Sequence, residues 1–251
     1  MRRTEEQRRL VDVFSAVCAE VGAPLPARAR VLDFGCGEGE AVVAWRAAGH
    51  DAVGCDIVLE RPGEGLYLIE TPYRLPFAAA TFDLVVSNQV LEHVQDHDLA
   101  FSEISRVLKP GSVSLHLFPA RWSPKEVHLG IPFGGVLQAR WWVTLWARLG
   151  IRNRFQTDLP WREVADLDVE YLRTRTNYLT RKQLAAVASR WFEEVRFIEI
   201  LALKYGRRSR HLYPLARGAP LLATLYGGLR SRFLLLRARE TGSDSNEALA
   251  Q

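Results

Sequence analysis

The sequence predicts an α/β protein with a doubly wound, mostly parallel sheet, an N-terminal helix and an insertion after the fifth strand. Two observations predict this fold. Short runs that are apolar on both faces alternate with amphipathic helices over residues 29–118, as in parallel sheets covered on both sides. A glycine-rich turn follows the first of these runs, at the usual place of a ligand-binding loop in such folds.

The composition is that of a soluble globular protein. The 251 residues are 48% hydrophobic and 25% charged, and no run approaches the ~20 apolar residues that a membrane-spanning helix needs. The N-terminal arginines have no apolar segment of a secretory signal behind them. The cysteines, Cys18, Cys36 and Cys55, are odd in number and widely spaced, which favours a reducing compartment. We therefore expect a cytoplasmic protein.

The predicted elements follow one another along the first half of the chain. Residues 5–21 have helical spacing of apolar side chains, and "TEEQ" predicts a capping box with Thr4 as N-cap. "ARVLDF" and "DAVGCD" predict two buried strands, separated by a helix at "EGEAVVAWRAAG". "GLYLIE" and "TFDLVVS" predict the third and fourth strands. Residues 96–109 predict a helix ended by "KPG", and "SVSLHLF" predicts a fifth strand.

The alternation stops after residue 118. Residues 119–179 hold five of the seven tryptophans and four prolines, and we expect them to form a lid over the C-terminal edge of the sheet, where ligands of such sheets bind. "TRKQLAAVASRWF" then predicts a helix and "EEVRFIEILAL" a late strand. One domain thus has five parts: an N-terminal helix, a cofactor-binding core, a lid, a returning helix and strand, and a basic C-terminal extension, over residues 1–28, 29–118, 119–179, 180–203 and 204–251.

The glycine loop "VLDFGCGEGE" does not fit a dinucleotide. The GxGxxG fingerprint requires a third glycine where Glu40 stands, and a pyrophosphate would be repelled by Glu38 and Glu40. Asp56 ends the second strand about twenty residues beyond the loop, the position at which a carboxylate usually accepts the ribose hydroxyls. The sequence therefore predicts a cofactor with a ribose and a positive charge, without a pyrophosphate.

Four segments together resemble a known family. "VLDFGCGEGE", "VGCDI", "LPFAAATFDLVVSNQVLEHV" and "RVLKPGS" are similar to class I S-adenosylmethionine-dependent methyltransferases of the group with an "LPF…FD…LEH" signature. The resemblance covers residues 30–118 and implies a Rossmann-like fold with S-adenosylmethionine as cofactor. It implies the following contacts: Asp33, Gly35 and Gly37 around the methionyl part, the backbone of Phe34 and Cys36, Asp56 on the ribose, Ile57 against adenine, and Asn88 near the sulfonium.

One position departs from the family pattern. Members commonly place an acidic and then a small residue before "LPF", and these contact adenine; here they are Thr71 and Pro72. Proline has no N–H, so the usual backbone contact cannot form. We expect Glu70 or the Thr71 hydroxyl to replace it.

Two histidines are candidates for the base that removes a proton from an acceptor hydroxyl. His93 lies in "LEHV" after the fourth strand, and His128 lies in the lid two residues from Glu126. The alternatives are that His93 only orders its loop and that His128 is a surface residue. Glu126 and His128 have no further metal ligands near them in the sequence, so no metal is expected. Among the lid tryptophans, Trp142 and Trp146 are expected to form its core, and Trp122 is left open.

The expected function is methylation, at oxygen, of a small-molecule, glycan or lipid-linked acceptor. The alternative is an RNA or other nucleic-acid methyltransferase, because residues 121–251 carry a balance of +10 against −6 for residues 1–120. "SNQV" stands where enzymes that methylate base amines have an Asn/Asp-Pro-Pro-aromatic motif, which disfavours that chemistry. A nicotinamide-dependent oxidoreductase is disfavoured by the glycine loop, and a cofactor-binding protein without activity is left open.

The basic C-terminal segment predicts an amphipathic helix with arginines beside its apolar side chains. Such a helix either lies on the anionic inner face of a membrane or packs on the protein itself or on a second copy. The oligomeric state is left open. The apolar residues at helical spacing are Leu222, Leu225, Tyr226, Leu229, Phe233 and Leu236.

Overall fold

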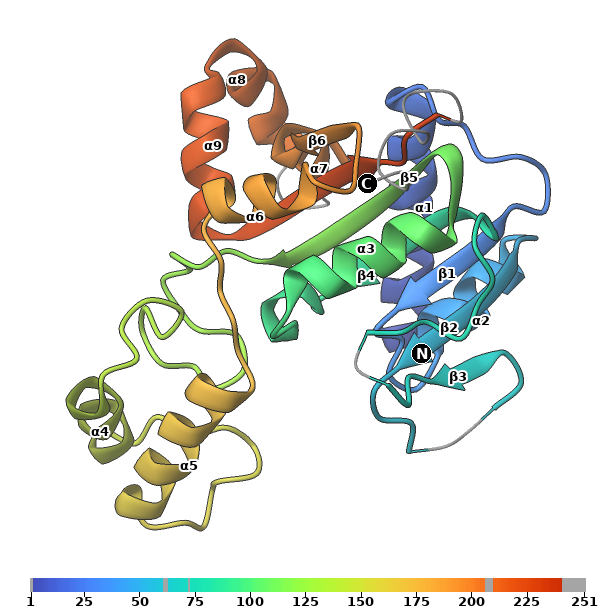
Figure 1. Cartoon of the computed structure of the whole chain (residues 1–251). Helices are drawn as coiled ribbons and strands as arrows, with labels where there is room; N and C mark the ends of the chain where they lie inside the picture. Colours follow the sequence, from blue (N-terminus) through green and yellow to red (C-terminus); the bar gives the residue numbers. More distant parts are fainter. Residues whose placement is uncertain (1, 61–62, 72, 206–209, 241–251) are drawn as a thin grey trace, which may run out of the picture.

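The computed structural model describes residues 2–60, 63–71, 73–205 and 210–240, and a seven-stranded sheet forms its centre (Figure 1). The strand order is β3-β2-β1-β4-β5-β7-β6, and only β7 runs antiparallel to its neighbours. The predicted doubly wound, mostly parallel sheet is confirmed. The strands are β1 Arg30–Phe34, β2 Asp51–Asp56, β3 Leu66–Leu68, β4 Phe82–Asn88, β5 Leu108–Pro119, β6 Glu194–Phe197 and β7 Ser231–Arg237.

Helices cover both faces of the sheet. Phe101 of α3 and Leu184 of α6 belong to the core on one face, whereas Phe14 of α1 and Trp45 of α2 belong to the core on the other. Strands buried on both faces have no polar side to alternate with, which explains the continuous apolar runs in the sequence. The helices are α1 Arg2–Glu20, α2 Glu40–Ala47, α3 His97–Val107, α4 Arg140–Arg148, α5 Trp161–Thr174, α6 Arg181–Ala188, α7 Glu199–Tyr205, α8 Tyr213–Gly218 and α9 Pro220–Leu229, with 3₁₀ turns at Leu91–His93 and Arg210–Leu212.

Two helix ends differ from the prediction. Helix α1 begins at Arg2, so Thr4 lies inside its first turn and the predicted capping box is wrong. Helix α3 ends at Val107, two residues before the predicted end, and β5 includes the "KPG" segment. The start of α3 is set by Asp96, whose side chain accepts a hydrogen bond from the Leu99 N–H at 3.0 Å.

The late strand is much shorter than predicted, four residues where the sequence suggested eleven. "EEVRFIEILAL" forms β6 only as far as Phe197, and helix α7 begins at Glu199. Glu, Leu, Ala and Lys, which make up most of α7, are good helix formers. Their propensity outweighs the apolar run that suggested a strand.

The predicted C-terminal amphipathic helix is only partly right, because its first four apolar residues lie in α9 and its last two do not. Helix α9 ends at Leu229, after Gly227 and Gly228, and the next residues form β7 between β5 and β6. Phe233 and Leu236 are buried in the sheet, where no membrane can reach them. The side chain of Leu222 and residues 241–251 lie outside the described part of the chain. A short apolar run fits a buried strand as well as one face of a helix, and here it is the strand. Among the described residues, no helix is long and apolar enough to cross a membrane.

The insertion carries α4 and α5, which Figure 1 shows beyond the end of β5. These two helices have an apolar core of their own, in which Trp142 and Trp146 pack beside Val143 and Leu172. The predicted lid-core role of the two tryptophans is confirmed. Trp122 is 55% exposed and takes no part in that core.

The position of β7 predicts a contrast between two C-terminal substitutions. Phe233→Ala should lower the free energy of unfolding by ~3–5 kcal/mol, because it opens a cavity in the sheet's core. Leu225→Ala, in α9 and 54% exposed, should change it by less than ~0.5 kcal/mol. Urea unfolding followed by circular dichroism measures both, and equal effects would contradict the buried strand.

Candidate functional site

The loop between β1 and α2 requires glycine at its first turn. Gly35 has a φ of 78°, and a Cβ atom there would lie 2.4 Å from the Val90 side chain, in the loop after β4. Gly37 also has a positive φ, 51°, but a Cβ atom there would meet nothing within 4 Å. The two loops at the ends of β1 and β4 are therefore in close contact only because residue 35 has no side chain.

Asp56, at the end of β2, holds this loop in place. Its carboxylate accepts hydrogen bonds from the Gly37 N–H at 2.8 Å and from the Val58 N–H at 3.2 Å. The carboxylate also borders an open pocket at the C-terminal ends of the strands.

This pocket contains part of the predicted cofactor set. Phe34, Gly35, Asp56 and Ile57 line it, as predicted from the sequence. Asp33 and Cys36 are buried, and they, Gly37, Thr71 and Asn88 are not among its lining residues. Glu70, one of the two alternatives expected at adenine, also lines the pocket. Sequence reasoning missed other parts of the lining, on the loops around β3 and β4 and at the end of α5: Ile69, Tyr73, Gln89, Val90, Tyr171, Thr174 and Arg175.

Backbone geometry marks two of the missed residues. Tyr73 and Gln89 have positive φ angles of 62° and 57°, which are uncommon for residues other than glycine and gather at functional sites. The Tyr73 hydroxyl accepts hydrogen bonds from the N–H groups of Gln95 (2.8 Å) and Asp96 (3.1 Å). No sequence signal identified these positions, because residues other than glycine whose backbone adopts a positive φ have no characteristic sequence pattern.

Asp33 is the most deeply buried acid beside the loop. Burial, with a further contribution from the Asp56 carboxylate, raises the pKa of Asp33 to about 7. The ionised form of Asp33 therefore costs free energy in the empty protein, and a positively charged ligand nearby would offset that cost.

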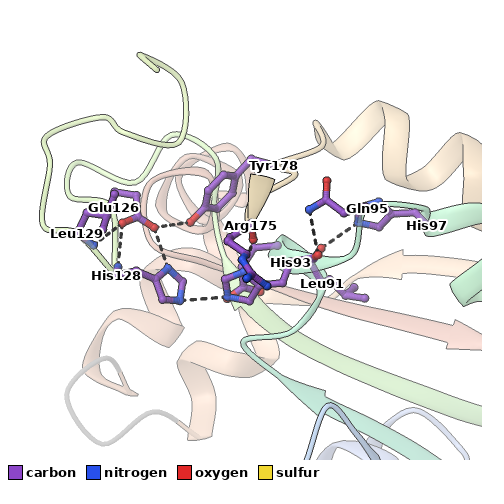
Figure 2. Close-up of polar contacts among 10 residues, drawn as sticks. Leu91, His93, Gln95, His97, Glu126, His128, Leu129, Arg175 and Tyr178 are labelled. Carbon is purple, nitrogen blue, oxygen red and sulfur yellow. Dashed lines mark hydrogen bonds and ion pairs between the residues drawn. The ribbon is translucent and has the colours of Figure 1, made fainter. Parts of the chain in front are cut away.

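The two histidine candidates lie in direct contact (Figure 2). The Nε2 atoms of His93 and His128 are 3.2 Å apart, although the residues come from the loop after β4 and from the insertion. The Nδ1 of His93 lies 2.6 Å from the Arg175 carbonyl oxygen, and the Nδ1 of His128 lies 2.8 Å from Glu126 Oε1. The expectation that Glu126 and His128 stand apart from other ligating groups is wrong, because folding brings His93 against them.

Glu126 is buried, and hydrogen bonds fix its carboxylate. It accepts from the N–H groups of His128 (2.9 Å) and Leu129 (2.6 Å) and from the Tyr178 hydroxyl at 2.8 Å. Burial alone would raise the pKa of Glu126, but these donors and the His128 ring lower it below its usual value. For His128, burial disfavours the charged ring, but the hydrogen bond to Glu126 and the charges of Glu126 and Glu92 together outweigh burial and raise the His128 pKa.

A second cavity adjoins the histidines on the side of Glu92. Its wall includes Glu92, Trp122 and Tyr178 together with the arginines Arg121 and Arg232. His93 lines the first pocket and Glu92 lines the second. The 3₁₀ turn Leu91–His93 therefore lies between the two.

A methyltransferase-domain family matches residues 3–190 of the chain. This is well over half of the sequence, and the chain belongs to that family. The resemblance inferred from the motifs is confirmed.

Curated relatives match over shorter stretches. The malonyl-(acyl-carrier protein) O-methyltransferase of Erwinia billingiae is 33% identical over 137 residues, 44% of this chain and 52% of the relative. A ubiquinone biosynthesis O-methyltransferase of Sinorhizobium fredii is 29% identical over 153 residues, 48% of this chain and 62% of the relative. The chain thus spans roughly half the length of the curated relatives it matches. Phosphoethanolamine N-methyltransferase 2 of Haemonchus contortus, solved with S-adenosyl-L-methionine, has a TM-score of 0.49 and 16% identity, over 90% of this chain and 52% of that one.

The raised pKa of Asp33 predicts a pH-dependent effect of Asp33→Asn. The folded pKa of about 7 exceeds the unfolded value near 3.8, so the stability associated with protonated Asp33 is full below pH 4 and is lost as pH rises towards 7. Asn carries no charge, and the variant should be more stable than the wild type by roughly 2–4 kcal/mol at pH 8, with a smaller difference at pH 5. Urea unfolding of the ligand-free proteins measures this. Asp56→Asn should reduce the pH slope, and a difference independent of pH would refute the assignment.

Proposed function

We propose that this chain, as a member of the methyltransferase-domain family, transfers the methyl group of S-adenosylmethionine to an oxygen atom of a small-molecule or carrier-linked acceptor. The observation that carries the proposal is the contact between His93 and His128 at the edge of the pocket formed by the glycine loop and Asp56. The O-methyltransferases among its relatives support the choice of oxygen.

The cofactor half of the site is supported by shape and charge. Gly35 and Phe34 would bring the backbone against the methionyl part, with Gly37 held by Asp56. The Asp56 carboxylate would accept the ribose hydroxyls, and Ile57, 63% exposed, would lie against adenine. Asp33, buried behind the loop beside Cys36, supplies negative charge towards the cationic cofactor.

Two of the proposed contacts shift by one residue. Glu70 lines the pocket and Thr71 does not, which favours Glu70 over the Thr71 hydroxyl at the adenine end; Pro72 lies outside the described residues. Gln89 lines the pocket, whereas Asn88, at the end of β4, does not. We therefore assign the sulfonium end to Gln89, with Asn88 supporting it.

The second cavity is the proposed entrance for the acceptor. Arg121, Arg181 and Arg232 line it, and the Nε of Arg121 is buried without a hydrogen-bond partner among the described residues. A buried N–H without a partner favours a substrate that brings an oxygen able to accept its hydrogen bond. Arg121 and Arg181 support an anionic acceptor, such as a carboxylate or a phosphate ester.

The chemistry requires little from the protein beyond alignment. When bound, S-adenosylmethionine would supply a methyl group on a cationic sulfur, which would leave as a neutral thioether when the acceptor oxygen takes the methyl group. If the nucleophile is a hydroxyl, its proton would move to the Nε2 of His128 or His93, and Glu126 would hold the His128 ring in place. If the nucleophile is a carboxylate, no proton needs to move.

The alternative acceptors draw less support. Two of the C-terminal arginines are engaged within the fold and are not free to meet phosphates, because Arg232 pairs with Glu199 at 2.9 Å and Arg237 with Glu194 at 3.0 Å. The amphipathic helix that suggested membrane contact ends at Leu229, and the arginine-rich segment after it forms strand β7. Neither is part of the proposal.

Calorimetry tests the cofactor. The protein should bind S-adenosylmethionine and its demethylated product and should not bind NAD. Gly35→Ala should weaken that binding at least tenfold, because its methyl group displaces the loop from Val90. Gly37→Ala has open space around its added methyl and should weaken binding less. Binding of NAD in place of the sulfonium compound would refute the proposal.

Turnover of two probe acceptors tests the base. His128→Ala should lower kcat for a phenolic acceptor by about 10²–10⁴, with cofactor affinity nearly unchanged. For a malonyl thioester, whose carboxylate is already ionised, the same variant should lose far less. Val127→Ala, at an exposed neighbouring position, is the control. Equal losses for both acceptors would show that His128 does not act as a base, and a larger loss from His93→Ala would transfer the role to His93.

A further inference from the structure

Both histidines have one ring nitrogen committed to an acceptor. The Nδ1 of His93 faces the Arg175 carbonyl oxygen, and the Nδ1 of His128 faces the Glu126 carboxylate. Neither oxygen can donate to the ring when Glu126 is ionised, and hydrogen bonds from two backbone N–H groups and from Tyr178 keep it ionised. Each Nδ1 must therefore carry the proton, which fixes the tautomer of both rings.

The other ring nitrogens then have free lone pairs that point at each other. With Nδ1 protonated, a neutral imidazole has no proton on Nε2, yet the two Nε2 atoms are 3.2 Å apart. Two lone pairs at this distance repel unless a cation lies between them, either a shared proton or a metal ion. Nitrogen ligands of a tetrahedral metal at ~2.0–2.1 Å lie about 3.3 Å apart, which matches the observed separation.

A buried carboxylate without a partner completes the cluster. Glu92 is 1% exposed, and neither of its carboxylate oxygens has a hydrogen bond among the described residues. Its Oε1 lies 3.9 Å from the Nε2 of His93. One ligand atom from each of Glu92, His93 and His128 falls within 4.8 Å of the others. A single proton would serve the two rings but would still leave both Glu92 side-chain oxygens without a hydrogen-bond partner among the described residues.

We propose that Glu92, His93 and His128 form a binding site for a divalent transition-metal cation of the Zn²⁺ class. Two imidazoles and one carboxylate are a common zinc ligand set with a fourth position open. The sequence predicted no metal here because Glu126 and His128 have no further ligands beside them along the chain. The fold supplies those ligands from the loop after β4.

The surroundings have the second layer of contacts that zinc sites usually have. A carboxylate or carbonyl on the far ring nitrogen of each histidine orients the ring and raises its basicity, and Glu126 and Arg175 occupy these positions. The described cysteines offer no competing site, since burial raises the thiol pKa of Cys18 and of Cys36 to about 12 and that of Cys55 well above its usual value. The open position lies between the two pockets, because His93 lines one and Glu92 the other.

Metal binding can be measured without cofactor or acceptor. The metal ion and the proton taken up from a hydroxyl acceptor would compete for the same Nε2 lone pairs. Zinc binding is a property distinct from methyl transfer and is tested separately. The full-length protein, freed of metal by chelation and dialysis, is titrated with Zn²⁺ in a calorimeter, and bound zinc is counted by mass spectrometry after a second dialysis. We expect one equivalent of zinc per chain.

Matched variants locate the zinc. Glu92→Gln should weaken binding at least tenfold and His128→Asn at least a hundredfold, whereas Glu126→Gln should weaken it by about 10–100-fold through the His128 ring. His211→Asn, an exposed histidine far from the cluster in sequence, should bind zinc as the wild type does. Circular dichroism confirms that each variant is folded.

Two outcomes would overturn the proposal. One is a wild-type protein that binds no zinc at micromolar concentration, which would leave the shared proton as the cation between the rings. The other is zinc binding that persists in folded Glu92→Gln and His128→Asn, which would place the metal elsewhere. If the wild-type protein does not bind S-adenosylmethionine, the proposed function is contradicted, but the zinc result is unaffected.

Discussion

The contact between the end of α5 and the loop after β4 is the constraint on which the site depends. The backbone N–H of Asn177 donates to the Glu92 carbonyl at 2.6 Å, and its side-chain amide donates to the carbonyls of Val94 and Gln95 at 3.1 and 3.0 Å. The Arg175 carbonyl accepts from His93 beside it. These bonds satisfy backbone groups that would otherwise remain unpaired at the edge of the sheet. They also bring the insertion close enough for His128 to meet His93.

The cofactor half of the fold could be predicted because its signals are local. A parallel strand buried on both faces is a continuous apolar run, and a loop that needs positive φ is rich in glycine. Gly35 and Asp56 could thus be identified from their positions alone. Strand β7 could not, because the run around Phe233 satisfies two periodicities, and only its pairing with β5 and β6 decides between them.

The rest of the site could be predicted only in pieces. His93 and His128 were each identified as candidates, but 35 residues separate them along the chain and nothing in either segment encodes their contact. Tyr171 belongs to helix α5 and Arg175 directly follows it. The spacing of a helix shows its apolar face and not the residues that border a pocket. Asn177 carries no motif at all. The tertiary packing of the insertion against the sheet determines where all of these residues lie.

Buried acids divide the site into two regions that each require positive charge. Asp33 and Asp56 lie beside the glycine loop, and burial raises the pKa of Asp33 to about 7. Glu92 and Glu126 lie beside the histidines. Burial raises the pKa of Glu92, whose carboxylate has no hydrogen bond within the described part of the chain, to about 7 as well. A buried carboxylate costs free energy unless a cation or donors compensate it. The two regions therefore favour different cations, a ligand with its own positive charge at the loop and a proton or metal ion between the rings.

The insertion can supply the second region because it is stabilised independently of the first. Its helices enclose their own core around Trp142, Trp146 and Leu172, apart from the two cores that flank the sheet. Near the histidines it meets the sheet's loops through hydrogen bonds such as those of Asn177. Substitutions on the insertion side of the proposed acceptor cavity would thus leave the packing beneath the glycine loop untouched, whereas a change at Gly35 or Val90 would disturb the loop itself. Under the proposed function, acceptor choice and cofactor binding would be separable in this fold, and they would meet at the Leu91–His93 turn.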